Sequence, residues 1–257
     1  MSAKKPLAVP ADIIYIYDGS FQGFLCCVFE SVYSGEMPVD IHTGKDQDMG
    51  LWDVKQISTD SEKAERVRSS IPSKLSNRAM ELVIAVFLSE LEHREIKLLG
   101  FLLRAYREGR QLLYKLGDPV MAPLLAAEKN LLGEAHLLKG FIRFSDADGV
   151  LVSTITPKNF VLPFIAEHFI LRYREESFII FDKTHSVALL YRNGKSEILW
   201  DSTIEFYRDS EQELKYQALW KRFYNTVAVE NRGNPRCRMT HMPKRYWENM
   251  LEVRDLL

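Results

Sequence analysis

The chain of 257 residues has 34 basic and 35 acidic side chains and a formal net charge of −1, which excludes a general attraction of its surface to nucleic acid or membranes. Hydrophobic residues make up 46% and charged residues 27%, as in globular proteins with a substantial core. Any binding of a polyanion must therefore be local.

The first part of the chain predicts a strand, a tight turn and a helix. Residues 13–17 are β-branched or aromatic throughout, which is typical of a buried strand. Asp18, Gly19 and Ser20 then break the strand, and Ser20 can cap the helix indicated by the apolar spacing of residues 24–32. Such a turn can hold a phosphate at the helix N-terminus, or it can be a plain turn with a cap.

The middle of the chain is predicted to be mainly helical, because its apolar residues recur at helical spacing over long stretches. In order, we expect a loop over 35–50, a strand over 51–59, a helix from Asp60 or Ser61 through Val67 that Pro72 ends or kinks, a long helical pattern over 79–114 that splits near His93, and a further helix over 121–138.

At Gly140 the pattern changes to that of a sheet. Residues 141–144 and 150–155 predict a hairpin with Asp148-Gly149 in its turn, and Asn193-Gly194 is the strongest signal for a second hairpin. The remaining expected elements are a helix from Thr156-Pro157 to about Tyr173, strands over 178–181, 186–191 and 197–200, a helix over 211–229, and a short terminal helix opened by Pro243.

These elements predict an α+β protein with an N-terminal strand-helix unit, a helical middle, and a largely antiparallel sheet with helical cover. Two portions are expected: residues 1–75, and residues 76–257 ending in a basic tail. The later strands come as neighbouring hairpins, which disfavours a doubly wound sheet. We expect one sheet to hold the strands of 141–155 and 178–200, with the helix of 156–173 packed on its face.

The basic tail, residues 231–247, contains five cations and no acidic residue. Cations, aromatic rings and short polar groups are the side chains that contact phosphates and stack on bases. Alternatively the run is a solvated loop, and Trp247 anchors the terminal helix. The candidate nucleic-acid-binding residues are Arg232, Arg236, Arg238, Lys244, Arg245, Tyr246 and Trp247.

A second set of polar residues suits acid–base chemistry. A hydrolase that acts on a flipped base needs a carboxylate or imidazole beside a water molecule. The alternative is that Asp182 and His185 simply close the turn between two strands, where such residues are common. An isolated helical histidine is also more often a surface residue than a ligand. The candidate catalytic residues are Asp182, His185, His136, Glu134 and Asp18.

The three cysteines show no disulfide or metal pattern. Cys26 and Cys27 are adjacent and Cys237 lies far from them, which disfavours disulfides and favours a reducing, cytoplasmic location. Cys237 and His241 are spaced like half a zinc site without the other half, and the zinc-deaminase pattern is absent. We therefore expect no metal and no other cofactor. No apolar run is long enough to span a membrane.

Several long motifs together resemble a bacterial family described only by a role in DNA metabolism. In chain order they are YIYDGSFQGFLCCVFESVY, EAHLLKGFIRF, HFILRY, FIIFDKTH and NPRCRMTHMPKRYWENM. The part from about Arg78 onward resembles a domain of unknown function that occurs fused to uracil-DNA-glycosylase-like domains. Members of the family are typically encoded beside a radical S-adenosylmethionine (radical-SAM) protein assigned to DNA modification or repair. The resemblance provides no established catalytic residues.

The resemblance implies a nucleic-acid-binding accessory protein in DNA modification or repair that acts on DNA with the radical-SAM partner. This chain has no three-cysteine cluster motif, so it would be the companion and not the cluster carrier. Two alternatives stay open: a hydrolytic, glycosylase-like enzyme that acts on a nucleobase or nucleotide, and a purely structural interaction protein.

Overall fold

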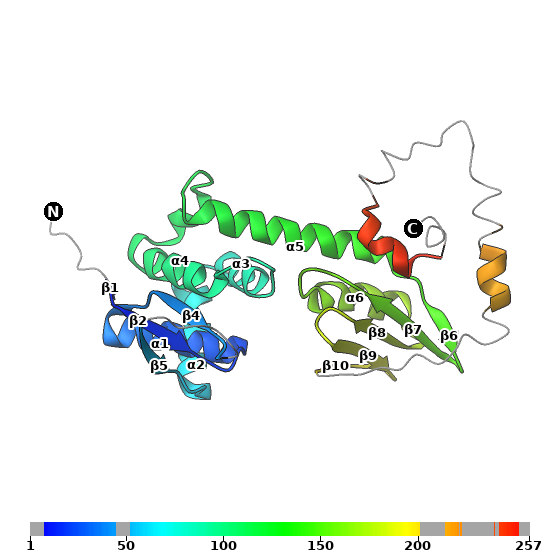
Figure 1. The fold of residues 1–257 in the computed structure, drawn as a ribbon, viewed down its shortest axis with the longest axis horizontal. Coiled ribbons are helices and arrows are strands. Elements are labelled where there is room, and N and C mark those ends of the chain that lie inside the picture. Colours follow the sequence, from blue (N-terminus) through cyan, green and yellow to red (C-terminus); the bar gives the residue numbers. More distant parts are fainter. Residues whose placement is uncertain are drawn as a thin grey trace. The chain divides into compact units, whose positions relative to one another are not determined.

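The computed structural model describes residues 8–44, 52–200, 214–220, 222, 239 and 242–251, and these form an α+β protein as predicted (Figure 1). The chain divides into two compact units, Met1–Leu131 and Leu132–Leu257. This division falls within helix α5 (Met121–Phe141), whereas the sequence placed a boundary near residue 75. None of the helices in the described ranges combines the length and the apolarity that crossing a bilayer requires.

The N-terminal unit is built on a parallel sheet of three strands. The central strand β2 (Ile13–Ile16) lies between β4 (Asp40–His42) and β5 (Asp53–Gln56), and the short strands β1 (Val9–Pro10) and β3 (Glu36–Met37) form a separate parallel pair. The predicted loop over 35–50 is therefore wrong for β3 and β4. Strands of two and three residues are too short to show an alternating pattern.

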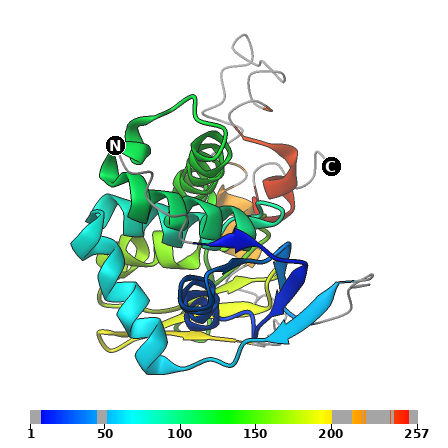
Figure 2. The same ribbon diagram turned by 90° about the vertical axis from the view of Figure 1, so that its left-hand side faces the viewer.

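Helix α1 (Phe21–Ser34) begins where the sequence predicts. The Ser20 hydroxyl accepts a hydrogen bond from the Gly23 N–H group at 2.9 Å, and Gly35 ends the helix in the left-handed region with φ 69°. Figure 2 shows α1 beside α2. The other helical segments of this unit are α2 (Ser61–Lys74), capped by Asp60 and containing Pro72 in its last turn, α3 (Asn77–Phe87), α4 (Arg94–Glu108) and the 3-10 segment η1 (Arg110–Tyr114).

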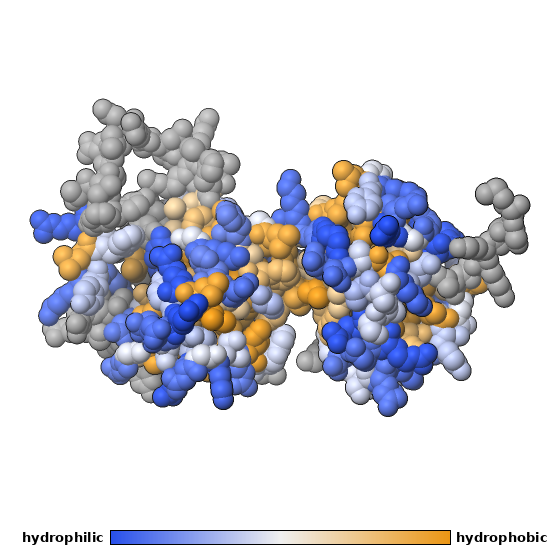
Figure 3. Space-filling view, turned by 180° about the vertical axis from the view of Figure 1, so that it is seen from behind, coloured by the Kyte–Doolittle hydropathy of each residue, from blue (hydrophilic) through white to orange (hydrophobic). Residues whose placement is uncertain are grey.

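One hydrophobic core unites the strand-helix start with the helical middle. Phe24 of α1, Leu82 of α3 and Leu98 of α4 are all fully buried in the same cluster. The Tyr17 hydroxyl after β2 also donates to the buried Glu95 carboxylate of α4 at 3.0 Å. Helices α3 and α4 thus complete the N-terminal unit, and its core includes side chains from both sides of residue 75. On the face shown in Figure 3, hydrophilic side chains cover much of this unit.

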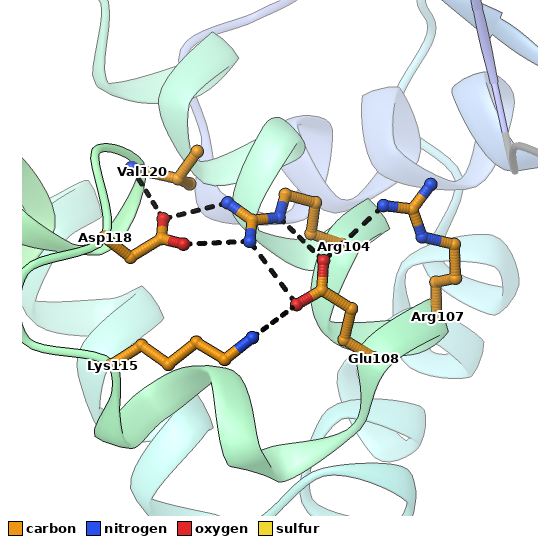
Figure 4. A network of polar contacts seen from close by, with 6 residues as sticks. All are labelled: Arg104, Arg107, Glu108, Lys115, Asp118 and Val120. Atoms are coloured by element: carbon orange, nitrogen blue, oxygen red, sulfur yellow. Dashed lines mark hydrogen bonds and ion pairs between the residues drawn. The ribbon is translucent and has the colours of Figure 1, made fainter.

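The predicted break near His93 is confirmed, and a polar network fixes the far end of α4. His93 adopts φ 51° immediately before α4. Arg104 donates from Nη1 and Nη2 to the two oxygens of Asp118 at 2.8 and 2.9 Å, and from Nε to Glu108 at 3.0 Å (Figure 4). These bonds hold the pKa of both carboxyl groups at about 2. The network joins α4 to the loop that precedes α5.

The C-terminal unit contains one five-stranded sheet, which confirms the predicted single, predominantly antiparallel sheet. Its order is β10-β9-β8-β7-β6, and among these described strands β7 and β8 form the one parallel pair. The Asn193-Gly194 hairpin is also confirmed, with both residues at positive φ. The strands are β6 (Ser145–Ala147), β7 (Val150–Ile155), β8 (Ser177–Asp182), β9 (Val187–Arg192) and β10 (Lys195–Leu199).

Two predicted boundaries in this unit are wrong. The first hairpin strand is β6 and not residues 141–144, because α5 continues to Phe141. The crossover helix α6 (Leu162–Arg172) begins later than Thr156-Pro157, because the backbone N–H groups of Lys158 and Asn159 bind a buried carboxylate instead of starting a helix. Helix α6 packs on the sheet, as predicted, where Phe169 is buried.

The end of the described chain is a 3-10 segment, η3 (Lys244–Asn249), which follows Pro243 as the sequence predicted. Residues 214–220 and 222 are helical and belong to the helix predicted over 211–229. The remaining residues of that predicted helix, and the tail residues Arg232, Arg236 and Arg238, lie outside the described ranges.

Candidate nucleic-acid interface

The candidate site lies at the carboxyl edge of β7 and β8. These strands run parallel with Ile155 beside Asp182, and the Lys183 N–H group donates to the Ile155 carbonyl at 3.0 Å. The loops that leave the two strands therefore start side by side. The carboxyl ends of parallel strands are where open sheets commonly bind ligands. Strand β10 runs in the same direction as β8, because each is antiparallel to β9, so its end at Leu199 lies at this edge too.

Asp182 and His185 are brought together at this edge. Asp182 is 0% exposed, and its Oδ2 lies 2.6 Å from His185 Nδ1. A carboxylate can only accept, so Nδ1 is the donor in this hydrogen bond. Oδ1 accepts from the backbone N–H groups of Thr184 and His185 at 3.0 and 3.1 Å. Asp182 thus both closes the β8–β9 turn and orients the imidazole.

Glu134 of α5 organises the loop after β7. Its buried carboxylate accepts hydrogen bonds from Lys158 N at 3.1 Å, Asn159 N at 2.8 Å, Asn159 Nδ2 at 2.6 Å, Arg245 Nη2 at 3.0 Å and the Tyr246 hydroxyl at 2.8 Å. Burial opposes the charge of Glu134, but these bonds outweigh it and hold its pKa below the ordinary value. The carboxylate is therefore a charged anchor of the fold.

The end of the chain docks onto this anchor. Tyr246 and Trp247 are only 2% and 5% exposed, and the Trp247 indole donates to the Met242 carbonyl at 2.8 Å. The Asn249 amide donates to the Thr156 hydroxyl at 3.2 Å, which fastens η3 to the loop after β7. The pKa of the Tyr246 hydroxyl is raised above its ordinary value, mainly because the group is buried. Neither ring presents a face to solvent in this structure, so the packing alternative describes them better than base stacking.

Four cations surround the same edge, and we call them the basic edge: Lys158, Lys183, Lys244 and Arg245. Each is exposed, and they come from three separate segments, the loop after β7, the turn after β8, and η3. The exposed Glu248 lies 4.0 Å from Lys183, and Lys244 lies over the Trp247 ring at 5.7 Å. Since the negative charge of Glu134 is buried, the exposed charge of these segments is predominantly positive.

Two aromatic side chains lie beside the imidazole. Phe160 packs edge-to-face with the His185 ring, with centroids 5.5 Å apart, and stacks on Trp200 with centroids 5.2 Å apart and an interplanar angle of 29°. Sequence reasoning missed Lys158, Lys183, Phe160 and Trp200 as site residues. The signal that could have found them is their position after strands predicted to share one sheet.

The other predicted catalytic residues do not join this cluster. His136 is exposed on α5, two residues after Glu134, and residues with that spacing do not share a helix face. Asp18 belongs to the N-terminal unit, where it accepts from the Ser20 hydroxyl and from the Thr59 hydroxyl, each at 2.7 Å. These bonds outweigh its burial and lower its pKa. A plain turn with a cap accounts for the geometry of Asp18.

No three His, Cys, Asp or Glu side chains of the described residues are arranged to hold a metal ion. Cys237 and His241, which are spaced like half a zinc site in the sequence, lie outside those residues. Cys26 and Cys27 are both buried in the core of the N-terminal unit, where burial raises the pKa of the Cys27 thiol.

The candidate interface lies in a region with a recognised family relationship. Residues 92–252 match a domain of unknown function, DUF4130, and the match covers more than half of the chain. The protein therefore belongs to the DUF4130 family. The matched region includes every described residue of the basic edge and its Glu134 anchor. No curated protein and no solved structure shows significant similarity to the chain.

Proposed function

We propose that the protein is a DNA-binding accessory protein in DNA modification or repair, and that it works with a radical-SAM partner. The observation that supports DNA binding is the gathering of Lys158, Lys183, Lys244 and Arg245 at one edge of the C-terminal unit. The DNA-repair setting and the partner rest on the resemblance of the motifs. The tail cations Arg232, Arg236 and Arg238 precede Lys244 in the chain and would extend the same contact.

The basic edge suits contact with a phosphate backbone. Lysine and arginine bind phosphates without regard to base sequence, and release of counterions drives the binding. Arg245 uses Nη2 for Glu134 and Tyr246, and its side chain remains 38% exposed, so its other donors can reach a phosphate. Glu134 thereby holds the Arg245 guanidinium in a fixed position before DNA binds.

The test of DNA binding is a charge-removal series. Wild-type affinity for duplex DNA should fall with a slope of about −3 to −5 in log affinity against log salt. Replacing Lys158, Lys183 and Lys244 by alanine should flatten this slope by about 2 to 3, since each lost phosphate contact removes roughly 0.9. Fluorescence anisotropy with two unrelated duplexes, between about 50 and 200 mM salt, measures both quantities.

A matched control removes the same charge from the opposite edge of the same sheet. Arg174 precedes β8, and Arg192 and Lys195 flank the β9–β10 turn; all three are exposed. Their joint replacement by alanine should leave the slope unchanged. Equal slopes for wild type and both triple variants would contradict the DNA-binding proposal. The proposed partnership is tested by a pull-down with the wild-type chain as bait. If no radical-SAM protein is retained, the proposal of a radical-SAM partner is wrong.

The Asp182–His185 hydrogen bond favours a second candidate function, hydrolysis of a nucleobase or nucleotide. A buried carboxylate that orients an imidazole is the arrangement used to make histidine a general base. His185→Ala should then lower base release from damaged DNA by about 10²- to 10⁴-fold while duplex affinity is kept. If wild-type protein releases no base from uracil-containing or alkylated DNA, the accessory role is the better description.

A further inference from the structure

The aromatic pair at the carboxyl edge combines an exposed ring with a fixed support. Trp200 is 65% exposed, although it is one of the largest apolar side chains. It stacks on Phe160, which is itself buried. One face of the indole is thus supported by a second ring, and much of the remaining indole surface is open to solvent. An indole that is supported on one face and open to solvent elsewhere offers a surface on which another flat ring can stack.

The support under Trp200 is held from two sides. Phe160 directly follows Asn159, whose backbone N–H group and side-chain amide both donate to the buried Glu134 carboxylate. On the other side Phe160 contacts the His185 ring, which Asp182 fixes at 2.6 Å. A ring held this way loses little conformational freedom when a ligand stacks on its partner, because its position is already fixed.

Charge around the pair indicates the kind of ligand. Lys158 lies two residues before Phe160, and Lys183 lies two residues before His185. Both lysines therefore lie at the same edge of the sheet as the aromatic pair. Aromatic rings that stack on bases, next to cations that contact the backbone, are the combination that binds single-stranded nucleic acid. A ligand with an anionic backbone and flat, unpaired bases matches both the lysines and the aromatic rings.

We propose that Trp200, supported by Phe160, is the platform on which an unpaired nucleobase of single-stranded DNA stacks. The proposal rests on the proposed DNA-binding function and names the form of DNA that the basic edge prefers. The base stacks on the open surface of the indole, and Lys158 and Lys183 contact the phosphates beside it. The platform takes the stacking role that the buried Tyr246 and Trp247 rings do not have in this structure.

The test compares Trp200→Ala and Trp200→Phe on single-stranded and duplex DNA of equal length. Trp200→Ala should weaken single-strand binding about fivefold to a hundredfold, the range for loss of one stacked base, and leave duplex affinity and its salt slope unchanged. Trp200→Phe should keep most of the single-strand affinity. Trp52→Ala, which removes an exposed indole from the N-terminal unit, should change neither.

A second measurement does not depend on the alanine variant being folded. Single-stranded DNA should quench the tryptophan fluorescence of the wild type, and Trp200→Phe should lose most of that quenching while it still binds. If Trp200→Ala binds single-stranded DNA as tightly as the wild type does, the proposal that Trp200 is a stacking platform is wrong. If the lysine variants flatten the duplex slope and Trp200→Ala has no effect, only the platform is wrong; if neither has an effect, DNA binding itself is wrong.

Discussion

Glu134→Ala is expected to lower the free energy of unfolding of the C-terminal unit by about 3–5 kcal/mol, the usual cost of breaking a buried, charged hydrogen-bond network. The substitution leaves the N–H groups of Lys158 and Asn159 and the Tyr246 hydroxyl without their acceptor. Each buried group that loses its partner costs about 1–3 kcal/mol. Chemical unfolding followed by circular dichroism measures the change.

The control for this prediction is His136→Ala, two residues further along the same helix. His136 is exposed, so its replacement should change the free energy of unfolding by less than about 0.5 kcal/mol. Glu134→Gln keeps the shape of the side chain and one acceptor oxygen, so its free energy of unfolding should lie between those of Glu134→Ala and His136→Ala. Similar stability of Glu134→Ala and His136→Ala would show that the carboxylate does not anchor the chain end.

Gly23→Ala and Gly133→Ala should change stability in opposite directions, although both glycines lie within helices. A Cβ atom at Gly23 would lie 2.2 Å from Asp18 Oδ1 and 2.9 Å from the buried Tyr17 ring. Nothing lies within 4 Å of the Cβ position at Gly133. Gly23→Ala should therefore destabilise by about 1–3 kcal/mol through overpacking. Gly133→Ala should stabilise by about 0.5–1 kcal/mol through better helix propensity.

The Gly23 effect has a specific origin that can be checked. The Asp18 carboxylate cannot move aside freely, because it accepts hydrogen bonds from Ser20 and from Thr59. Gly23→Ala must either break those bonds or displace α1 from the sheet. Gly23→Ala combined with Asp18→Ala should therefore be less destabilising than the sum of the two single changes. Strict additivity would mean that the alanine does not collide with the carboxylate.

Local signals predicted most of the secondary structure correctly. The Ser20 cap, the break at His93 and the Asn193-Gly194 turn are each determined by a few adjacent residues, so a sequence pattern is enough to find them. The start of α6 was wrong for the opposite reason. Thr156-Pro157 has the local pattern of a helix start, but Glu134 of a different helix takes the next N–H groups.

The candidate site was only partly predictable, because its parts meet through long-range pairing. Asp182 and His185 were found since they are three residues apart. Lys158 and Lys183 meet only because β7 and β8 run parallel, and hairpin patterns do not indicate a parallel neighbour. Composition favoured Tyr246 as a stacking ring, yet its hydroxyl is bound to a helix far away in the chain.

The distance between Glu134 and Tyr246 along the chain also sets an order of events during synthesis. The two residues are 112 positions apart, so at about 5–20 residues per second the helix emerges from the ribosome roughly 6–22 s before its partner. During that interval the carboxylate is without the phenol and guanidinium that later cover it. Lys244 and Arg245 are also made after Lys158 and Lys183. The four cations of the basic edge can therefore come together only after Arg245 has been made, whereas the sheet that carries Lys158 and Lys183 precedes it in the chain.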